Sequence, residues 1–263
     1  MKLLFFDIDG TILGPDRKIP PSVASAMDAA HRRGHLLFIN TGRTYCNRER
    51  LLDGYPLDGW VMGCGARIIY HEETLQSHEY PLRDSLRLRD LLRDLRLPAL
   101  YECDTGMYFD PDGPDHPAFE RYQYYSKLRG THRLIREDDP EFRVVKLFCF
   151  SEARGPVAEL ERRATEMGMP YTAIDVGRTA WEVVQAGCSK GTGMAFLRER
   201  FGAKPEDCYA FGDSANDLPM LREAGYSVAM GNAPEEVKRV CSYVTDLPER
   251  DGIEKAMIHF GLI

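Results

Sequence analysis

Two carboxylates stand one residue apart near the start of the chain, in the run Asp7-Ile8-Asp9-Gly10-Thr11. The apolar residues Leu3–Phe6 directly before them predict a buried strand, which would hold groups at its carboxyl end rigidly. Gly10 lets the chain turn sharply there, so both acids can converge on one small site. Phosphate esters need a nucleophile that can approach an anion and a proton donor for the leaving alkoxide. The pair therefore predicts phosphoryl transfer, with Asp7 as nucleophile and Asp9 as proton donor. The alternative is that both acids cap the following turn.

A second apolar strand ends in the same way. The chain passes from the apolar run Cys208-Tyr209-Ala210-Phe211 into a glycine and clustered acids, Gly212-Asp213-Ser214-Ala215-Asn216-Asp217. Carboxylate and carbonyl oxygens are the ligands that Mg²⁺ prefers, and Mg²⁺ bridges readily to phosphate oxygens. We therefore expect Mg²⁺ at this edge, held by Asp7, Asp213 and the Asp9 backbone carbonyl. Asn216 and Asp217 lie just beyond, where they would orient substrate, Asp213 or a water. Asp217 is also a candidate metal ligand, although it is equally suited to capping the helix that follows it.

Two further segments suit phosphate binding. The strand 36–39 leads into Asn40-Thr41-Gly42-Arg43, where the Thr41 hydroxyl and the Gly42 amide can donate hydrogen bonds to phosphate oxygens. Lys190 precedes a predicted helix and can neutralise charge on the nucleophile and on the transferring group. Taken singly, Thr-Gly after a strand is an ordinary turn, and a single lysine is ordinarily a solvated surface charge.

Composition restricts the class of protein. The chain has 263 residues, 43% of them hydrophobic, which is enough for one large α/β domain or two moderate ones. Its formal charge of −7, without a basic block, argues against a nucleic-acid-binding face. Only four apolar residues separate Met1-Lys2 from Asp7, too few for a signal peptide, and no stretch reaches membrane-spanning length. We expect a cytoplasmic protein without a membrane partner.

The seven cysteines and seven histidines are dispersed along the chain. The cysteines show no paired short spacing, which argues against disulfides and against a structural zinc site. We assign none of the histidines to a metal.

The order of predicted elements indicates an α/β fold with an insertion. A helix over residues 22–33, closed by Gly34, lies between the strands 3–6 and 36–39, and short runs at 60–62 and 67–70 continue the sheet or add a hairpin. The alternation stops near residue 82. It resumes with a helix over 191–200, a strand over 208–211 and further units through Val228 and Val244. We expect a discontinuous core of residues 1–81 and 185–263.

The inserted region, residues 82–184, has the character of a separate α+β domain. A charged helical segment is predicted over 83–96 and an amphipathic helix over 156–167, and turns at 104–106 and 110–113 separate short strand-like pieces between them. Strands over 144–150, 171–175 and 180–184 would form its sheet. Phe119, Tyr122, Tyr124 and Tyr125 are candidates to face a substrate, but an apolar seam in this domain is the more common use of such residues.

These motifs, in this order, resemble the haloacid dehalogenase superfamily of phosphotransferases. The matches are Asp7/Asp9, Thr41, Lys190 and Gly212-Asp213 with Asn216-Asp217. The wide gap from Thr41 to Lys190 is similar to that of the Cof-type subfamily, and so are the phrases Thr41-Gly42-Arg43, Ser189-Lys190-Gly191 and Ala229-Met230-Gly231-Asn232-Ala233. The resemblance covers nearly the whole chain. It implies a Rossmann-like parallel-sheet core with an inserted α+β cap that determines substrate specificity.

The resemblance also implies roles for these residues. Asp7 would form an aspartyl-phosphate with Mg²⁺ beside it, and Asp9 would protonate the leaving group and then activate water. Lys190 and Thr41 would stabilise the phosphoryl group, and Arg43 joins the residues expected to bind substrate. Cys64 departs from the family pattern, which often has Asn at this position before Gly65-Ala66, so any hydrogen bond made by that Asn is in doubt.

The function expected is hydrolysis of small phosphorylated metabolites, sugar phosphates above all, by a monomer or weak homodimer. Two alternatives remain open. A phosphomutase would return the phosphoryl group to another hydroxyl of the substrate, and a non-catalytic sensor would only bind a phosphorylated metabolite. Dehalogenation is disfavoured, because a departing halide does not require the proton that Asp9 can give.

Overall fold

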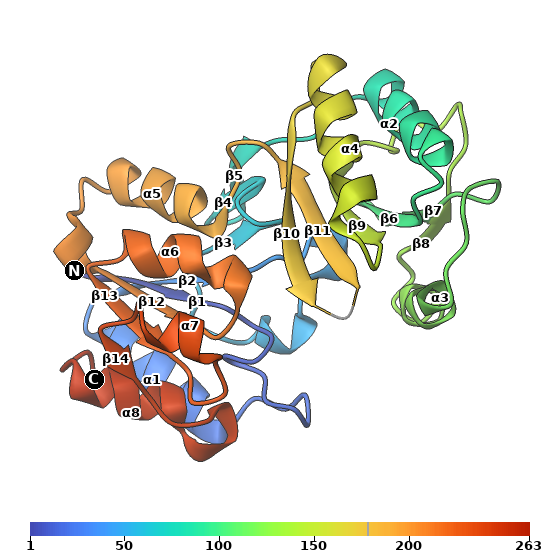
Figure 1. The fold of residues 1–263 in the computed structure, drawn as a ribbon. Helices are drawn as coiled ribbons and strands as arrows, with labels where there is room; N and C mark the ends of the chain where they lie inside the picture. Colours follow the sequence, from blue (N-terminus) through green and yellow to red (C-terminus); the bar gives the residue numbers. More distant parts are fainter. Residues whose placement is uncertain (178) are drawn as a thin grey trace. The chain divides into compact units, whose positions relative to one another are not determined.

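The computed structural model describes residues 1–177 and 179–263, which form two compact units. Unit 1 comprises Met1–Gly42, Glu49–Gln76 and Ser189–Ile263, and unit 2 comprises Arg43–Arg48 and Ser77–Cys188. Each unit has its own sheet with helices packed on it (Figure 1). This arrangement confirms the predicted fold class, an α/β core interrupted by an inserted α+β domain.

Unit 1 is built on an eight-stranded sheet in the order β14-β13-β12-β1-β2-β3-β4-β5. The strands from β14 to β3 are parallel, and β4 pairs with β3 in the antiparallel sense, so the short runs form a hairpin. The strands are β1 (Leu3–Phe6), β2 (Leu36–Asn40), β3 (Gly59–Met62), β4 (Arg67–Tyr70), β5 (Glu73–Ser77), β12 (Cys208–Gly212), β13 (Tyr226–Ala229) and β14 (Tyr243–Val244).

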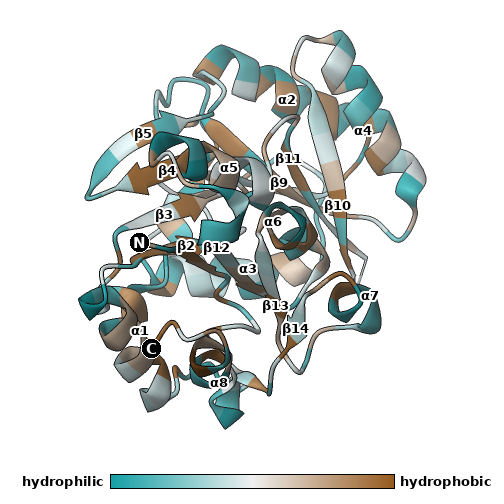
Figure 2. Ribbon diagram, turned by 90° about the vertical axis from the view of Figure 1, so that its left-hand side faces the viewer, coloured by the Kyte–Doolittle hydropathy of each residue, from teal (hydrophilic) through white to brown (hydrophobic). Residues whose placement is uncertain are grey.

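Helices cover both faces of this sheet, which explains why β1 is apolar throughout. Leu4 and Phe6 pack with α1 (Pro21–Arg32) and α8 (Gly252–His259) on one face. Leu3 and Phe5 pack on the other face, with α5 (Lys190–Arg200), α6 (Leu218–Glu223) and α7 (Glu235–Lys238). Burial on both faces stabilises a central strand whose every side chain is apolar. Figure 2 shows hydrophobic residues along these inner strands and hydrophilic ones on outward-facing helix surfaces.

Local sequence signals set the helix ends in unit 1. Pro21 occupies the first position of α1, where its missing N–H costs nothing, and Gly34 follows the helix with φ of +78°. Helix α5 begins with a capping box, in which the Ser189 hydroxyl oxygen accepts the Thr192 N–H and the Thr192 hydroxyl oxygen accepts the Ser189 N–H. Short 3₁₀ helices complete the connections: η1 (Tyr45–Asn47, in unit 2), η2 (Arg50–Leu52), η3 (Pro205–Asp207), η4 (Ala215–Asp217) and η5 (Pro248–Arg250).

Unit 2 contains a six-stranded sheet in the order β10-β11-β9-β6-β7-β8. Helices α2 (Leu82–Asp94) and α4 (Arg154–Glu166) cover one face, while α3 (Ala118–Leu128) packs through Phe119 against residues of the other. The three predicted strands are present as β9, β10 and β11, and β6 and β7 correspond to the short strand-like pieces expected on either side of the turn at 104–106, whereas β8 and α3 were not predicted. The strands are β6 (Ala99–Cys103), β7 (Met107–Phe109), β8 (His132–Leu134), β9 (Val144–Phe150), β10 (Tyr171–Gly177) and β11 (Ala180–Gln185).

The aromatic residues of α3 divide between core and surface. Phe119 is buried and Tyr122 packs beside it, as expected for an apolar seam. Tyr124 and Tyr125 are exposed, so the seam includes only part of the predicted set.

The limits of unit 2 differ from the expected insertion. It extends over Ser77–Cys188 instead of residues 82–184, and it also takes in Arg43–Arg48, which the sequence pattern placed with the core. The reason lies in a side-chain contact: the Thr44 hydroxyl donates to Glu102 Oε2 on β6 at 3.0 Å, which holds this short segment against the sheet of unit 2. None of the helices in the described parts of the chain combines the length and apolar character needed to span a bilayer.

Candidate active site

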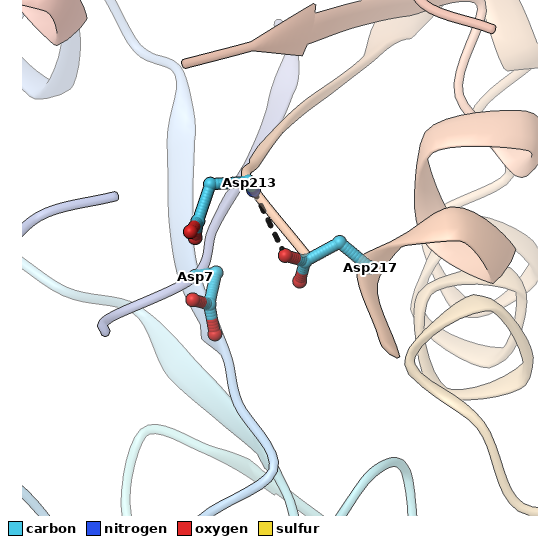
Figure 3. Close-up of side chains that lie close together, drawn as sticks. All are labelled: Asp7, Asp213 and Asp217. Atoms are coloured by element: carbon cyan, nitrogen blue, oxygen red, sulfur yellow. Dashed lines mark hydrogen bonds between the residues drawn. The ribbon is translucent and has the colours of Figure 1, made fainter. Parts of the chain in front are cut away.

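The carboxyl ends of β1 and β12 bring two of the predicted acids together in unit 1. These strands are parallel neighbours with Phe6 opposite Phe211, and the Asp7 N–H donates to the Phe211 carbonyl at 3.0 Å. Asp7 and Asp213 therefore leave adjacent strands at the same edge. Asp217 reaches the same place from η4, and its carboxylate points toward the other two (Figure 3). One oxygen of each carboxylate lies within 4.8 Å of the others.

Lys190 joins this group from the first turn of α5. Its Nζ donates to Asp7 Oδ1 at 2.6 Å and to Asp217 Oδ1 at 2.5 Å, and the side chain is only 1% exposed. The Lys190 carbonyl accepts a hydrogen bond from Asn40 Nδ2 at 2.8 Å, which ties the start of α5 to the end of β2. A lysine this deeply buried and doubly paired is not the ordinary solvated surface charge.

Asp217 holds the loop that carries Asp213. Its Oδ2 accepts hydrogen bonds from the backbone N–H groups of Asp213 and Ser214, both at 2.9 Å, and from the Ser214 hydroxyl at 3.1 Å. Its side chain is completely buried. Because Oδ1 is occupied by Lys190, both oxygens already accept protein donors. The capping contacts considered for Asp217 are therefore present, together with the contact to Lys190.

Burial and mutual repulsion shift the proton affinities of the carboxylates. Loss of solvation on burial, reinforced by the charge of Asp217, raises the pKa of Asp213 to about 7. Burial also raises the pKa of Asp7 well above its usual value, although the charge of Lys190 opposes this shift. For Lys190, burial acts to lower the pKa, but the charges of Asp217 and Asp7 outweigh it and raise the pKa. Lys190 therefore remains a cation.

The donor set fits a hard divalent cation. With all three carboxylates ionised, Lys190 balances only one negative charge, so a surplus of negative charge is buried in one place. A cation bound by oxygen ligands would compensate for this surplus. Asp7 and Asp213 are the better ligands, because Asp217 already accepts four hydrogen bonds, one of them from the Lys190 cation, whereas Asp213 accepts two, both from neutral side chains.

Asp213 is oriented by two residues to which the sequence reasoning gave no role. The Thr11 hydroxyl donates to Asp213 Oδ1, and Asn232 Nδ2 donates to Oδ2, both at 3.1 Å. Asn232 Nδ2 also donates to the Gly10 carbonyl at 3.0 Å, so it links the turn after β1 to the loop after β12. Asn232 lies in the phrase 229–233 that carried part of the family resemblance, which was the available signal.

Gly10 is required for the close approach of these loops. Its φ is +90°, and a Cβ built on it would lie 2.2 Å from Asp213 Oδ2. A side chain at this position would therefore displace the Asp213 carboxylate.

Asp9 lies in different surroundings from Asp7. Its side chain is half exposed, and its Oδ1 lies 3.6 Å from the Arg17 guanidinium, which also lies 3.5 Å from Glu49 Oε2. Among the described residues, the group of three carboxylates that can hold a metal does not include the Asp9 side chain. The Arg17 contact was not predicted, because nothing in the loop sequence marks it.

The remaining predicted residues are placed as follows. Thr41 is buried at the end of β2, with its N–H donating to the Val61 carbonyl at 2.8 Å and its own carbonyl accepting from Cys64 N at 3.1 Å. Cys64 is buried with φ of +55°, an uncommon conformation for a residue other than glycine.

Three predicted substrate-binding residues remain. Asn216 Oδ1 accepts a hydrogen bond from the Ser214 hydroxyl at 2.9 Å. Gly42 ends the first segment of unit 1, and Arg43 begins the segment assigned to unit 2.

Comparison with known proteins extends over the whole chain. A profile of the haloacid dehalogenase-like hydrolases matches residues 4–257. The HMP-PP phosphatase of Serratia proteamaculans is 28% identical over 249 residues, covering 90% of this chain and 86% of that protein. The 5-amino-6-(5-phospho-D-ribitylamino)uracil phosphatase YcsE of Bacillus subtilis is 26% identical over 263 residues, covering 100% and 96%.

A solved structure agrees with the sequence matches. The structure of the HAD subclass IIB sugar phosphatase BT4131 superimposes with a TM-score of 0.82 at 28% identity, covering 100% of both chains. The chain therefore belongs to the haloacid dehalogenase-like hydrolase family, in its Cof-type, subclass IIB branch, and is a phosphatase that acts on small phosphorylated metabolites.

Proposed function

We propose that this phosphatase hydrolyses phosphate monoesters through an aspartyl-phosphate on Asp7, with Mg²⁺ as cofactor. The observation that carries the proposal is the position of Asp7, at the end of a central strand and paired with Lys190 Nζ at 2.6 Å beside Asp213. Lys190 occupies Oδ1, so Oδ2 is the oxygen left to attack phosphorus. Mg²⁺, when bound by Asp7 and Asp213, would screen the negative charges of the nucleophile and the phosphate.

The chain's own groups account for both half-reactions. In the first, an Asp7 oxygen forms a bond to phosphorus while the bond to the leaving oxygen breaks, and Asp9 gives that oxygen its proton. In the second, Asp9 takes a proton from a water molecule that attacks phosphorus, and the Asp7 carboxylate departs. Lys190 stabilises the negative charge on the transferring group, together with the Thr41 hydroxyl and the Gly42 amide. Asn216 and Arg43 complete the proposed substrate-binding residues, and Asp217 holds Lys190 and the Asp213 loop.

Sugar phosphates are the proposed substrates, and unit 2 is proposed to recognise the leaving alcohol. Support comes from the similarity to the sugar phosphatase BT4131 along the full length of both chains. The names of the two curated relatives indicate other phosphorylated small molecules, so the assay must include HMP-PP and phosphorylated ribitylaminouracil. The cytoplasmic location and the monomeric or weakly dimeric state also stay predictions.

The test is phosphate release from this panel with Mg²⁺, with and without EDTA, for the natural chain and for Asp7→Asn. We expect release with sugar phosphates that EDTA and Asp7→Asn each abolish, while the circular dichroism spectrum of the variant stays unchanged. Turnover by Asp7→Asn, or full activity in excess EDTA, would refute the mechanism. Conversion of a sugar phosphate to an isomer without phosphate release would identify a phosphomutase instead.

A further inference from the structure

Asn40 is a buried polar residue of unit 1 to which the proposed mechanism gives no role. It is the last residue of β2, directly before Thr41, and it is 0% exposed. Leu36 and Phe38 of the same strand belong to a core cluster that also contains apolar residues of α5. Because side chains two positions apart on a strand share a face, Asn40 lies on the face that α5 covers. An amide thus occupies a position of the apolar core.

The Asn40 amide is only partly satisfied there. Asn40 Nδ2 donates to the Lys190 carbonyl at 2.8 Å, whereas Asn40 Oδ1 has no hydrogen-bond partner among the described residues. Burying a polar atom without a partner is unfavourable, so an apolar side chain would suit this position better on packing grounds alone. The bond to the backbone of Lys190 is therefore what distinguishes Asn40 from an ordinary core residue.

Lys190 needs an anchor because the first turn of its helix is intrinsically weak. The turn contains Gly191 and Gly193, and glycine favours a helix less than any residue except proline. A Cβ on Gly191 would lie 2.6 Å from the Pro219 carbonyl oxygen, and one on Gly193 would lie 2.4 Å from Val61 Cγ1. Close packing against α6 and β3 therefore excludes better helix formers at both positions. A side-chain bond can supply the order that these glycines do not.

This anchor stands beside the ion pair that the mechanism requires. Lys190 Nζ donates to Asp7 Oδ1 at 2.6 Å, and Asp7 directly follows β1. Strands β1 and β2 are parallel neighbours with Phe6 opposite Ile39, and Asp7 and Asn40 are the residues that follow this pair. Adjacent strand ends thus hold the two ends of Lys190: Asn40 binds its backbone, and Asp7 binds its ammonium. The capping box of α5, in contrast, joins the helix start only to itself.

We propose that Asn40 is a positioning residue, which fixes the backbone of Lys190 so that the ammonium is held where it stabilises the transferring phosphoryl group. Without this bond the first turn of α5 would move more freely, and Lys190 would spend less time in the productive geometry. The loss should appear in kcat more than in KM, because the contact matters most in the transition state. This effect on rate rests on the role proposed for Lys190 above, whereas the effect on the ammonium itself does not.

The first experiment compares Asn40→Ala with the matched control Thr245→Ala. The buried Thr245 hydroxyl donates to the Gly252 carbonyl at 2.6 Å, so it also binds the first residue of a helix, but α8 carries none of the proposed site residues. With p-nitrophenyl phosphate and Mg²⁺, we expect kcat to fall at least about tenfold in Asn40→Ala with little change in KM. Thr245→Ala should keep the natural kcat. Asn40→Leu, which fills the position without a donor, should match Asn40→Ala. An unchanged kcat in the Asn40 variants, or an equal fall in the control, would overturn the proposal.

The second experiment follows the Lys190 ammonium by ¹H–¹⁵N NMR. It does not depend on turnover, so it separates a failure of this proposal from a failure of the phosphatase mechanism. We expect a slowly exchanging signal, identified by its loss in Lys190→Arg, whose exchange with water is at least about tenfold faster in Asn40→Ala. The buried Lys146 ammonium, paired with Glu182 at 2.7 Å in unit 2, should keep its rate. Absence of a slow Lys190 signal from the natural chain, an unchanged rate in Asn40→Ala, or equal acceleration of both lysines would overturn the proposal.

Discussion

The two acids of the opening motif differ in their exposure to solvent. Asp7 is 4% exposed and paired with Lys190, while the Asp9 side chain is 50% exposed near Arg17. A buried carboxylate held by a cation is suited to attack, and a half-exposed one can exchange protons with solvent between the two half-reactions. We therefore propose Asp7 as the nucleophile and Asp9 as the general acid and base.

This division predicts how Asp9→Asn depends on the leaving group. Loss of general acid–base assistance should lower kcat by ~10²–10⁴-fold for an alkyl phosphate. An aryl phosphate with an acidic phenol should lose less in the first step, because that phenolate departs without a proton. The measurement is single-turnover kinetics of enzyme phosphorylation with both substrates. Equal losses for the two would show that Asp9 does not protonate the leaving group.

Asp217 is predicted to matter for stability as well as for rate. Its carboxylate is fully buried and accepts from Lys190 and from the Asp213 loop. Asp217→Asn would place an amide N–H₂ against these donors, and breaking a buried pair in this way costs about 3–5 kcal/mol. Urea unfolding should detect the loss.

The matched control for Asp217 is Asp207→Asn, which breaks the partly exposed pair with Lys2. Surface pairs contribute about 0–1 kcal/mol, so this variant should unfold close to the natural chain. If the two variants lost equal stability, Asp217 would have no special structural role.

The sequence predicted which residues gather at the site better than how they are held. Asp7, Lys190, Asp213 and Asp217 meet because parallel strand ends share an edge, and strands can be recognised from apolar runs. The contacts of Thr11 and Asn232 with Asp213 depend on side-chain reach between loops far apart in the chain. No local pattern encodes such a distance.

At the scale of elements, the turn after β1 predicts a contrast between two glycines. Gly10 and Gly34 both have positive φ, so alanine at either position should impose a similar backbone strain. Only at Gly10 would the new Cβ meet Asp213 Oδ2, since nothing lies within 4 Å of a Cβ at Gly34. Gly10→Ala should therefore lose Mg²⁺ affinity and activity, and Gly34→Ala should keep both. Titration calorimetry and phosphate release will measure this, and equal Mg²⁺ affinity in the two variants would contradict it.

Strands and helices could be predicted from the sequence where a single hydrophobic pattern ran through the whole element. The strands β1, β2 and β12 are continuous apolar runs because both sheet faces are covered. Helix α3 was missed because it buries only Phe119 and Ser126, so its sequence lacks the regular apolar stripe that marks a helix. Strand β8 was missed because its three residues are too few to show alternation.

At the scale of the whole molecule, the unexpected feature is that the chain enters unit 2 twice. Arg43–Arg48 joins it through the contact of Thr44 with Glu102, and the main insertion follows from Ser77. Sequence composition changes near residue 82 but not near residue 43, so only the second passage was visible. The Thr41 and Lys190 motifs each lie within two residues of a boundary between the units.

The charge surplus at the acidic site links the stability of the whole chain to pH. A carboxyl whose pKa is raised in the folded state binds more protons there than in the unfolded state. For Asp213, whose pKa is about 7 in the folded chain against an ordinary value of 3.8, this makes the metal-free chain lose stability as pH rises between those values. Asp7 is shifted in the same direction.

Mg²⁺ should reverse that loss where the carboxylates are ionised. At pH 5 protons compete with the metal for Asp7 and Asp213, whereas at pH 8 the ionised ligands are available. We expect saturating Mg²⁺ at one fixed concentration to raise Tm more at pH 8 than at pH 5, measured by calorimetry. Asp213→Asn should remove most of this difference, because it removes both a titrating group and a ligand. An equal or larger Mg²⁺ shift at pH 5 would mean that the metal does not bind through these carboxylates.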